Sequence, residues 1–165
     1  MIEIRTAETA DAERLLEIYG YYVRNTAISF EYETPSLGEF AGRMERTLEK
    51  YPYLVLVRDG KIEGYAYAGP FKDRAAYGWS CEISIYLDRN ARKRGLGRML
   101  SEALEQELKR MGILNLYGCI AYRKKRMNTS RQTVRIITGI SVLKRSAYSA
   151  GSSFQIRSSI LDTAL

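Results

Sequence analysis

The chain has 165 residues, 45% of them hydrophobic, which is typical of one domain that buries a core without disulfides. No apolar run reaches the roughly 18 residues of a membrane span, and no signal-peptide pattern is visible, so we expect a cytoplasmic protein without a membrane partner. The absence of histidine excludes Ser-His-Asp and Cys-His systems and HExxH zinc sites. Cys81 and Cys119 lack CxxC spacing, so we expect two buried thiols and no metal site.

The net charge of +7 is unevenly distributed along the chain. Residues 123–165 hold nine basic residues and one acidic residue, which gives this tail +8 and leaves residues 1–122 close to neutral at −1. A partly disordered tail is the simplest interpretation. A nucleic-acid-binding arm is an alternative, but basic residues are sparse after Arg126, so we rank nucleic acid last among the partners.

The first third of the chain predicts one strand and two helices. A short strand is expected over Glu3–Thr6, and a helix over about Ala10–Val23, where apolar residues recur at the helical period. Ser36 and Glu39 form a capping-box pattern, which predicts that a second helix begins there and runs to about Lys50.

The middle of the chain predicts three strands. Tyr53–Arg58 and Lys61–Ala68 flank Asp59-Gly60, which is a hairpin signal. A loop then leads to a strand over Trp79–Asp88. Alternation along this last strand places Glu82, Ser84 and Tyr86 on one face and Cys81, Ile83, Ile85 and Leu87 on the other.

The predicted third helix, Met99–Met111, is amphipathic, and Gly112 is its expected C-terminal stop. Its apolar side consists of Leu100, Ala103, Leu104, Leu108 and Met111. A fifth strand is expected over Asn115–Tyr122, and Gln132–Val142 could form another. The order β-α-α-β-β-β-α-β predicts an α+β fold with a mixed sheet, and it leaves the strands after Tyr122 undetermined.

A basic turn precedes the third helix, with the sequence Arg92-Lys93-Arg94-Gly95-Leu96-Gly97. Unpaired N–H groups and the positive end of the macrodipole make a helix N-terminus an anion site. Gly95 and Gly97 let the backbone approach a pyrophosphate, and Arg98 adds positive charge. A Walker lysine is missing, and Leu100 replaces the third glycine of the dinucleotide pattern. The alternative is a basic turn that only begins a helix.

This turn, read as Arg92-x-x-Gly95-x-Gly97, resembles the acetyl-coenzyme A motif of the GNAT N-acetyltransferases. The segments Tyr65–Lys72, Arg74–Trp79 and Glu82–Leu87 look like the phosphinothricin acetyltransferase branch of that family. The resemblance covers about residues 2–122. It implies a GNAT-like, mostly antiparallel sheet flanked by helices, acetyl-CoA as co-substrate without a metal, a small amino-acid acceptor and a homodimer.

The same resemblance implies roles for individual residues. Glu82 would be the catalytic base, usually through water, although an acid in a strand can also simply pair with a cation. The coenzyme would be held by the backbone of Ile85, Tyr86 and Leu87 and by Arg92, Lys93, Arg94, Gly95, Leu96, Gly97 and Arg98. The acceptor would be phosphinothricin, methionine sulfoximine or methionine sulfone, in a pocket of Phe30, Arg74, Tyr77 and Trp79. Arg74 would be the partner of an anionic group.

The resemblance stops after Tyr122. Family members continue with an acidic stretch, a helix and two closing strands that supply a tyrosine acid, and residues 123–165 show none of these. We hypothesise a reading-frame change, because codons for Arg123–Asn128 and Ile136–Ser141 can be chosen so that a shifted frame reads as family sequence. Residues 1–122 would then be the acetyl-CoA-binding body. The alternative to an enzyme is an impaired CoA-binding product in which Tyr148 is the available substitute acid.

Overall fold

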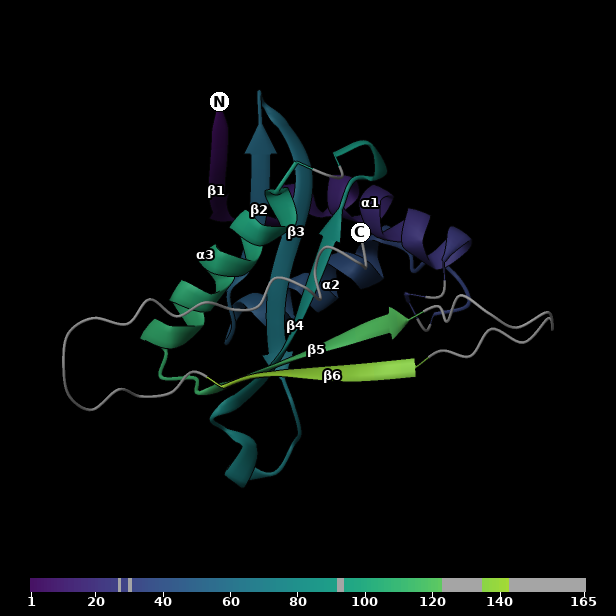
Figure 1. The fold of residues 1–165 in the computed structure, drawn as a ribbon. Helices are drawn as coiled ribbons and strands as arrows, with labels where there is room; N and C mark the ends of the chain where they lie inside the picture. Colours follow the sequence, from purple (N-terminus) through teal and green to yellow (C-terminus); the bar gives the residue numbers. More distant parts are fainter. Residues whose placement is uncertain (27, 30, 92–93, 123–134, 143–165) are drawn as a thin grey trace.

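The computed structural model describes residues 1–26, 28–29, 31–91, 94–122 and 135–142. They form a six-stranded sheet in which β1 to β6 lie in chain order, with helices on both faces (Figure 1). Neighbouring strands are antiparallel except β4 and β5, which are parallel. The predicted α+β fold with a mixed, mostly antiparallel sheet is therefore confirmed. Among the described helices, none is long and apolar enough to cross a membrane.

The elements agree with the predicted ones to within about three residues at each end. The strands are β1 (Ile2–Thr6), β2 (Tyr53–Arg58), β3 (Lys61–Pro70), β4 (Ser80–Leu87), β5 (Asn115–Tyr122) and β6 (Arg135–Val142). The helices are α1 (Ala12–Asn25), α2 (Leu37–Leu48) and α3 (Leu96–Arg110), with short 3-10 turns at Thr9–Asp11, Ala75–Tyr77 and Arg89–Ala91. Of the basic tail, the structure describes only 135–142, which form β6. Residues 123–134 and 143–165, including Tyr148, lie outside the described residues.

Local signals explain where the elements begin and turn. Asp59 and Gly60 both have positive φ, 50° and 80°, which is the conformation that a two-residue hairpin between β2 and β3 requires. The Ser36 hydroxyl accepts a hydrogen bond from the Glu39 amide at 3.2 Å and so caps the N-terminus of α2. These are the positions at which the sequence predicted a hairpin turn and a helix start.

Two apolar cores lie on opposite faces of the sheet. Helix α3 covers one face, with Leu100, Leu104 and Leu108 packed on Leu56 and Cys81. Helices α1 and α2 cover the other face, where Leu15, Ile18, Phe40 and Met44 pack on Val55 and Tyr65. The alternation predicted for β4 is confirmed, because Cys81 and Leu87 face α3 while Tyr86 packs on the α1 side.

Two burial predictions are wrong. Met111 is 48% exposed because α3 ends at Arg110 and Gly112 reverses the chain with φ of 80°. Cys119 is exposed because it follows Gly118, the last residue of β5 that pairs with β4. Cys81 is buried as expected, and burial raises the pKa of its thiol to about 11.

Strands β4 and β5 pair along only half of their length. Their register runs from Ser80 opposite Asn115 to Ile83 opposite Gly118. Beyond that point β4 continues beside β3 and β5 continues beside β6, and the two strands diverge (Figure 1). Within the part of the chain that the structure describes, no strand pairs with the side of 84–87 that faces β5. We call this side the open edge of β4.

Candidate active site

The open edge of β4 presents backbone groups. The Asp88 amide donates to the Glu63 carbonyl on β3 at 2.7 Å. Backbone polar groups of successive strand residues point to alternate edges, so those of Ile85 and Leu87 point away from β3. The Leu87 carbonyl accepts the Tyr22 hydroxyl of α1 at 2.7 Å. The backbone groups of Ile85 are left facing the open edge, where an extended ligand with amide groups can bind as an added strand would.

The N-terminus of α3 follows closely in the chain. Gly95 is its N-cap, with φ of 73°, a left-handed conformation that favours glycine. The Gly95 carbonyl accepts the Met99 amide at 3.1 Å. Because a glycine cap has no side chain, it offers no side-chain acceptor to the first N–H groups, and the first turn holds no acidic residue. The backbone at Leu96 and Gly97 therefore starts a helix whose positive end suits an anion.

Positive charge surrounds this helix start. Arg94 and Arg98 are exposed, and Arg98 forms an i,i+4 ion pair with Glu102 at 2.7 Å. Arg92 and Lys93 lie outside the described residues. The described parts of the predicted coenzyme segment, 85–87 and 94–98, thus lie at the open edge of β4 and at the start of α3.

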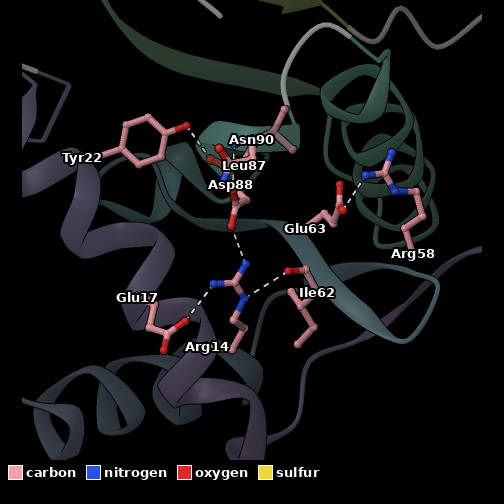
Figure 2. A network of polar contacts seen from close by, with 9 residues as sticks. All are labelled: Arg14, Glu17, Tyr22, Arg58, Ile62, Glu63, Leu87, Asp88 and Asn90. Carbon is pink, nitrogen blue, oxygen red and sulfur yellow. Dashed lines mark hydrogen bonds and ion pairs between the residues drawn. The ribbon is translucent and has the colours of Figure 1, made fainter.

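A polar network from α1 holds the turn between β4 and α3 (Figure 2). Arg14 pairs with the Asp88 carboxylate and donates to the Ile62 carbonyl at 3.2 Å. Asp88 also accepts the Asn90 amide at 2.8 Å. Burial raises the pKa of Asp88, but the Asn90 amide and the Arg14 guanidinium outweigh it, so the pKa is lowered overall. Sequence reasoning missed this network, although Asp followed two residues later by a turn amide is a recognised local pattern.

Glu82 lies on the α1 and α2 face of the sheet, where β4 still pairs with β5. It is opposite Gly69 of β3 and Tyr117 of β5. Its side chain is exposed, and within the described ranges its carboxylate forms no ion pair. The alternative of a simple structural ion pair therefore finds no partner among these residues. Burial and the Glu82 charge together raise the pKa of the nearby Cys119 thiol.

A cavity of about 110 Å³ opens on the same face, between α1, α2 and the sheet. We call it the tyrosine cavity, and its polar lining consists of Tyr19, Glu31, Arg43, Thr47, Tyr53, Tyr65 and Tyr67. Tyr67 links the cavity to Glu82: burial and the Glu82 and Glu31 carboxylates raise the pKa of Tyr67, while nearby Ser84 and Arg43 lower it, and the pKa is raised overall. The tyrosine cavity thus begins one side chain away from Glu82.

Ring stacking makes the wall of the tyrosine cavity rigid. Tyr53 stacks on Tyr67 with ring centroids 4.8 Å apart, and Tyr65 stacks on Tyr86 at 5.3 Å. Tyr86 also meets Tyr19 edge-on at 5.3 Å. The side chain of Tyr86 therefore supports the wall of the tyrosine cavity, while its backbone belongs to the strand that carries the open edge.

The predicted acceptor residues lie elsewhere. Arg74, Tyr77 and Trp79 are exposed in the loop between β3 and β4, and none of them lines the tyrosine cavity. Phe30 lies outside the described residues. Sequence reasoning did not find Tyr19, Glu31, Arg43 and Tyr67 as site candidates. The one available signal was the alternation of Tyr65 and Tyr67 on a strand next to that of Glu82.

Comparison with known proteins agrees with this geometry. Residues 4–151 match the acetyltransferase (GNAT) domain family. The chain is 32% identical over 119 residues to phosphinothricin N-acetyltransferase of Streptomyces viridochromogenes, covering 72% of this chain and 65% of the relative. It is 33% identical over 110 residues to an L-methionine sulfoximine/L-methionine sulfone acetyltransferase of Salmonella typhimurium, and this match covers 66% of this chain and 64% of the relative. The chain thus spans slightly less than two thirds of the length of these relatives.

A solved structure has the same fold. It is a GNAT superfamily phosphinothricin acetyltransferase from Sinorhizobium meliloti in complex with AcCoA. The TM-score is 0.70 at 35% sequence identity, and the match covers 72% of this chain and 65% of that one.

Proposed function

This chain belongs to the GNAT acetyltransferase domain family, and on that premise we propose that it transfers the acetyl group of acetyl-CoA to the α-amine of a small amino acid. The acceptor belongs to the phosphinothricin, methionine sulfoximine and methionine sulfone class, by analogy with the relatives. The proposal is carried by the position of Glu82 on β4, two residues before the open edge and diagonally across from Tyr67, which lines the tyrosine cavity.

The residues of the coenzyme segment fit acetyl-CoA. The uncapped N-terminus of α3 at Gly95, flanked by Arg94 and Arg98, suits the pyrophosphate. The backbone of Ile85 at the open edge suits the amide groups of the pantetheine arm. When bound, the coenzyme supplies a thioester as the acetyl donor.

Glu82 is the general base in this proposal. The acceptor amine is protonated at neutral pH and must lose a proton before its nitrogen can attack the thioester carbonyl. Glu82 takes that proton, directly or through water, because it is exposed and carries no ion pair within the described residues. A backbone N–H at the open edge donates to the carbonyl oxygen as negative charge develops on it. The C–N bond forms, the C–S bond breaks, and the CoA thiolate leaves and takes a proton from water.

The test is a thiol-release assay with acetyl-CoA and each of the three amino acids, with the product identified by mass. We expect release of CoA only when an amino acid is present, together with a product that is heavier by one acetyl group. Acetyl-CoA binding without thiol release above background for any of them would contradict acetyl transfer and favour a coenzyme-binding product without activity.

The proposal also includes a homodimer, which the family resemblance implies, and a cytoplasmic location. Sedimentation of the purified chain over a range of concentrations measures the mass in solution. A mass of twice 18.9 kDa is expected, and a monomer at all concentrations would contradict the dimer without affecting the proposed reaction.

A further inference from the structure

We infer that the tyrosine cavity receives the side chain of the acceptor, and that it selects an uncharged hydrogen-bond-accepting group, such as a sulfone or sulfoximine, over an anionic phosphinate. The inference rests on the proposed acetyl transfer and narrows its substrate class. It concerns two groups to which neither the sequence nor the comparisons assign a role, Glu31 and Arg43.

The position of the tyrosine cavity suits a side chain attached to an amine at Glu82. Tyr67 pairs with Ser84 across β3 and β4, and Glu82 pairs with Gly69, so Tyr67 and Glu82 are diagonal neighbours on one face of the sheet. Residues in that relation lie about 7–8 Å apart, within reach of long side chains. An amino acid the size of methionine can place its amine at one end of this span and its side-chain terminus at the other.

The charges at the mouth of the tyrosine cavity disfavour an anion. Arg43 and Glu31 line the cavity and form an ion pair, and Arg43 also contacts the Glu39 carboxylate at 2.5 Å. The positive charge of Arg43 is therefore already shared between two carboxylates, and the three groups together carry −1. The Glu31 and Arg43 side chains are 32% and 41% exposed, so an entering group passes them first. A phosphinate would meet an excess of negative charge there.

The deep end of the tyrosine cavity offers hydrogen-bond donors without charge. Tyr53 and Tyr65 are only 4% and 1% exposed, and both line the cavity. Burial raises the pKa of both phenols well above the ordinary value, so they stay protonated and keep a hydroxyl to donate. A sulfone oxygen accepts such hydrogen bonds and brings no net charge into the buried end, which avoids the cost of burying an unpaired ion.

The first test compares kcat/KM for methionine sulfone and phosphinothricin. We expect the wild-type chain to prefer the sulfone by about 10-fold or more, and Glu31→Gln to lower that preference about 10-fold, because it removes one negative charge without changing volume. Glu45→Gln is the matched control, an exposed α2 carboxylate that does not line the cavity. It should leave the ratio unchanged.

An equal or higher kcat/KM for phosphinothricin in the wild type would overturn the inference, as would an unchanged ratio in Glu31→Gln with wild-type thermal unfolding. If neither amino acid is acetylated, the proposed function fails, and the inference is judged by binding alone. Calorimetric titration of each amino acid into the full chain with CoA measures this. Tighter binding of the sulfone that is lost in Glu31→Gln supports the inference, and equal affinities or no binding of the sulfone overturn it.

Discussion

The coenzyme side and the acceptor side of the candidate site are built in different ways. The proposed coenzyme side comes from one stretch of sequence, 85–98, and its described residues would bind through backbone groups whose direction is set by strand register and by the left-handed Gly95. The acceptor side collects side chains from α1, the following loop, α2, β2 and β3. Backbone chemistry tolerates most side chains, whereas a wall of side chains changes with each substitution. Changes on the first side should therefore alter coenzyme affinity, and changes on the second should alter acceptor selectivity.

The largest expected effect is at Glu82, the proposed base, which lies diagonally across from Tyr67 and two residues before the open edge of β4. Glu82→Gln should lower kcat by about 10²–10⁴-fold because it removes the group that accepts the amine proton. Acetyl-CoA affinity, measured by calorimetry, should change little. Glu49→Gln, an exposed carboxylate at the end of α2, should retain full activity. A Glu82→Gln variant with near wild-type kcat would contradict the assignment of the base.

A second prediction tests whether the backbone conformation at the start of α3 determines the affinity for acetyl-CoA. Gly95→Ala forces a residue with a Cβ into φ of 73°, a strain of about 1–2 kcal/mol. The KM for acetyl-CoA should rise about 10-fold as the first turn of α3 shifts, while the preference among acceptors stays the same. Gly38→Ala is the control, since Gly38 lies in α2 with open space around its Cβ position. A folded Gly95→Ala protein with an unchanged KM for acetyl-CoA would contradict the proposal that the start of α3 binds the coenzyme.

A third prediction tests the acceptor side. Tyr67→Phe removes the hydroxyl of a residue that lines the tyrosine cavity, and with it one hydrogen-bond donor for the acceptor in the proposed binding mode. The loss of one hydrogen bond is worth about 1 kcal/mol, so kcat/KM for the amino acid should fall about 5-fold. The KM for acetyl-CoA should stay constant, and Tyr32→Phe, at a fully exposed tyrosine, should change neither value. A rise in coenzyme KM alone would show that the two sides are not separate.

The smallest expected effect concerns the network in Figure 2, in which Arg14 of α1 holds Asp88 in the turn after β4. The folded-state pKa of Asp88 is lowered, so its contribution to stability is present above the unfolded-state pKa of about 3.9 and is lost as pH falls through the folded-state value. Asp88→Asn should destabilise the protein by about 1–2 kcal/mol at pH 7, and the difference should shrink towards pH 3. Urea unfolding at both pH values measures this, and a deficit independent of pH would contradict it.

The elements of the proposed coenzyme side are easier to find in the sequence than those of the acceptor side for a physical reason. A strand, a turn with Gly95 and Gly97 and an amphipathic helix are contiguous, so spacing alone reveals their order. The tyrosine cavity depends on which residues the sheet and the two helices bring together, and Tyr19, Glu31, Arg43 and Tyr67 come from separate segments. Tyrosines at alternate strand positions are equally expected in a core. The burial errors at Met111 and Cys119 have a related origin, because each lies just beyond the end of an element.

The most direct measurement is a crystal structure of this chain with CoA and methionine sulfone bound together. We expect the pyrophosphate to bind at the amides of 95–98 and the amino acid nitrogen to lie beside Glu82. The sulfone oxygens should lie in the tyrosine cavity near Tyr53 and Tyr65. A coenzyme bound away from the open edge of β4, or a sulfone held by Arg74 with the tyrosine cavity empty, would contradict this arrangement.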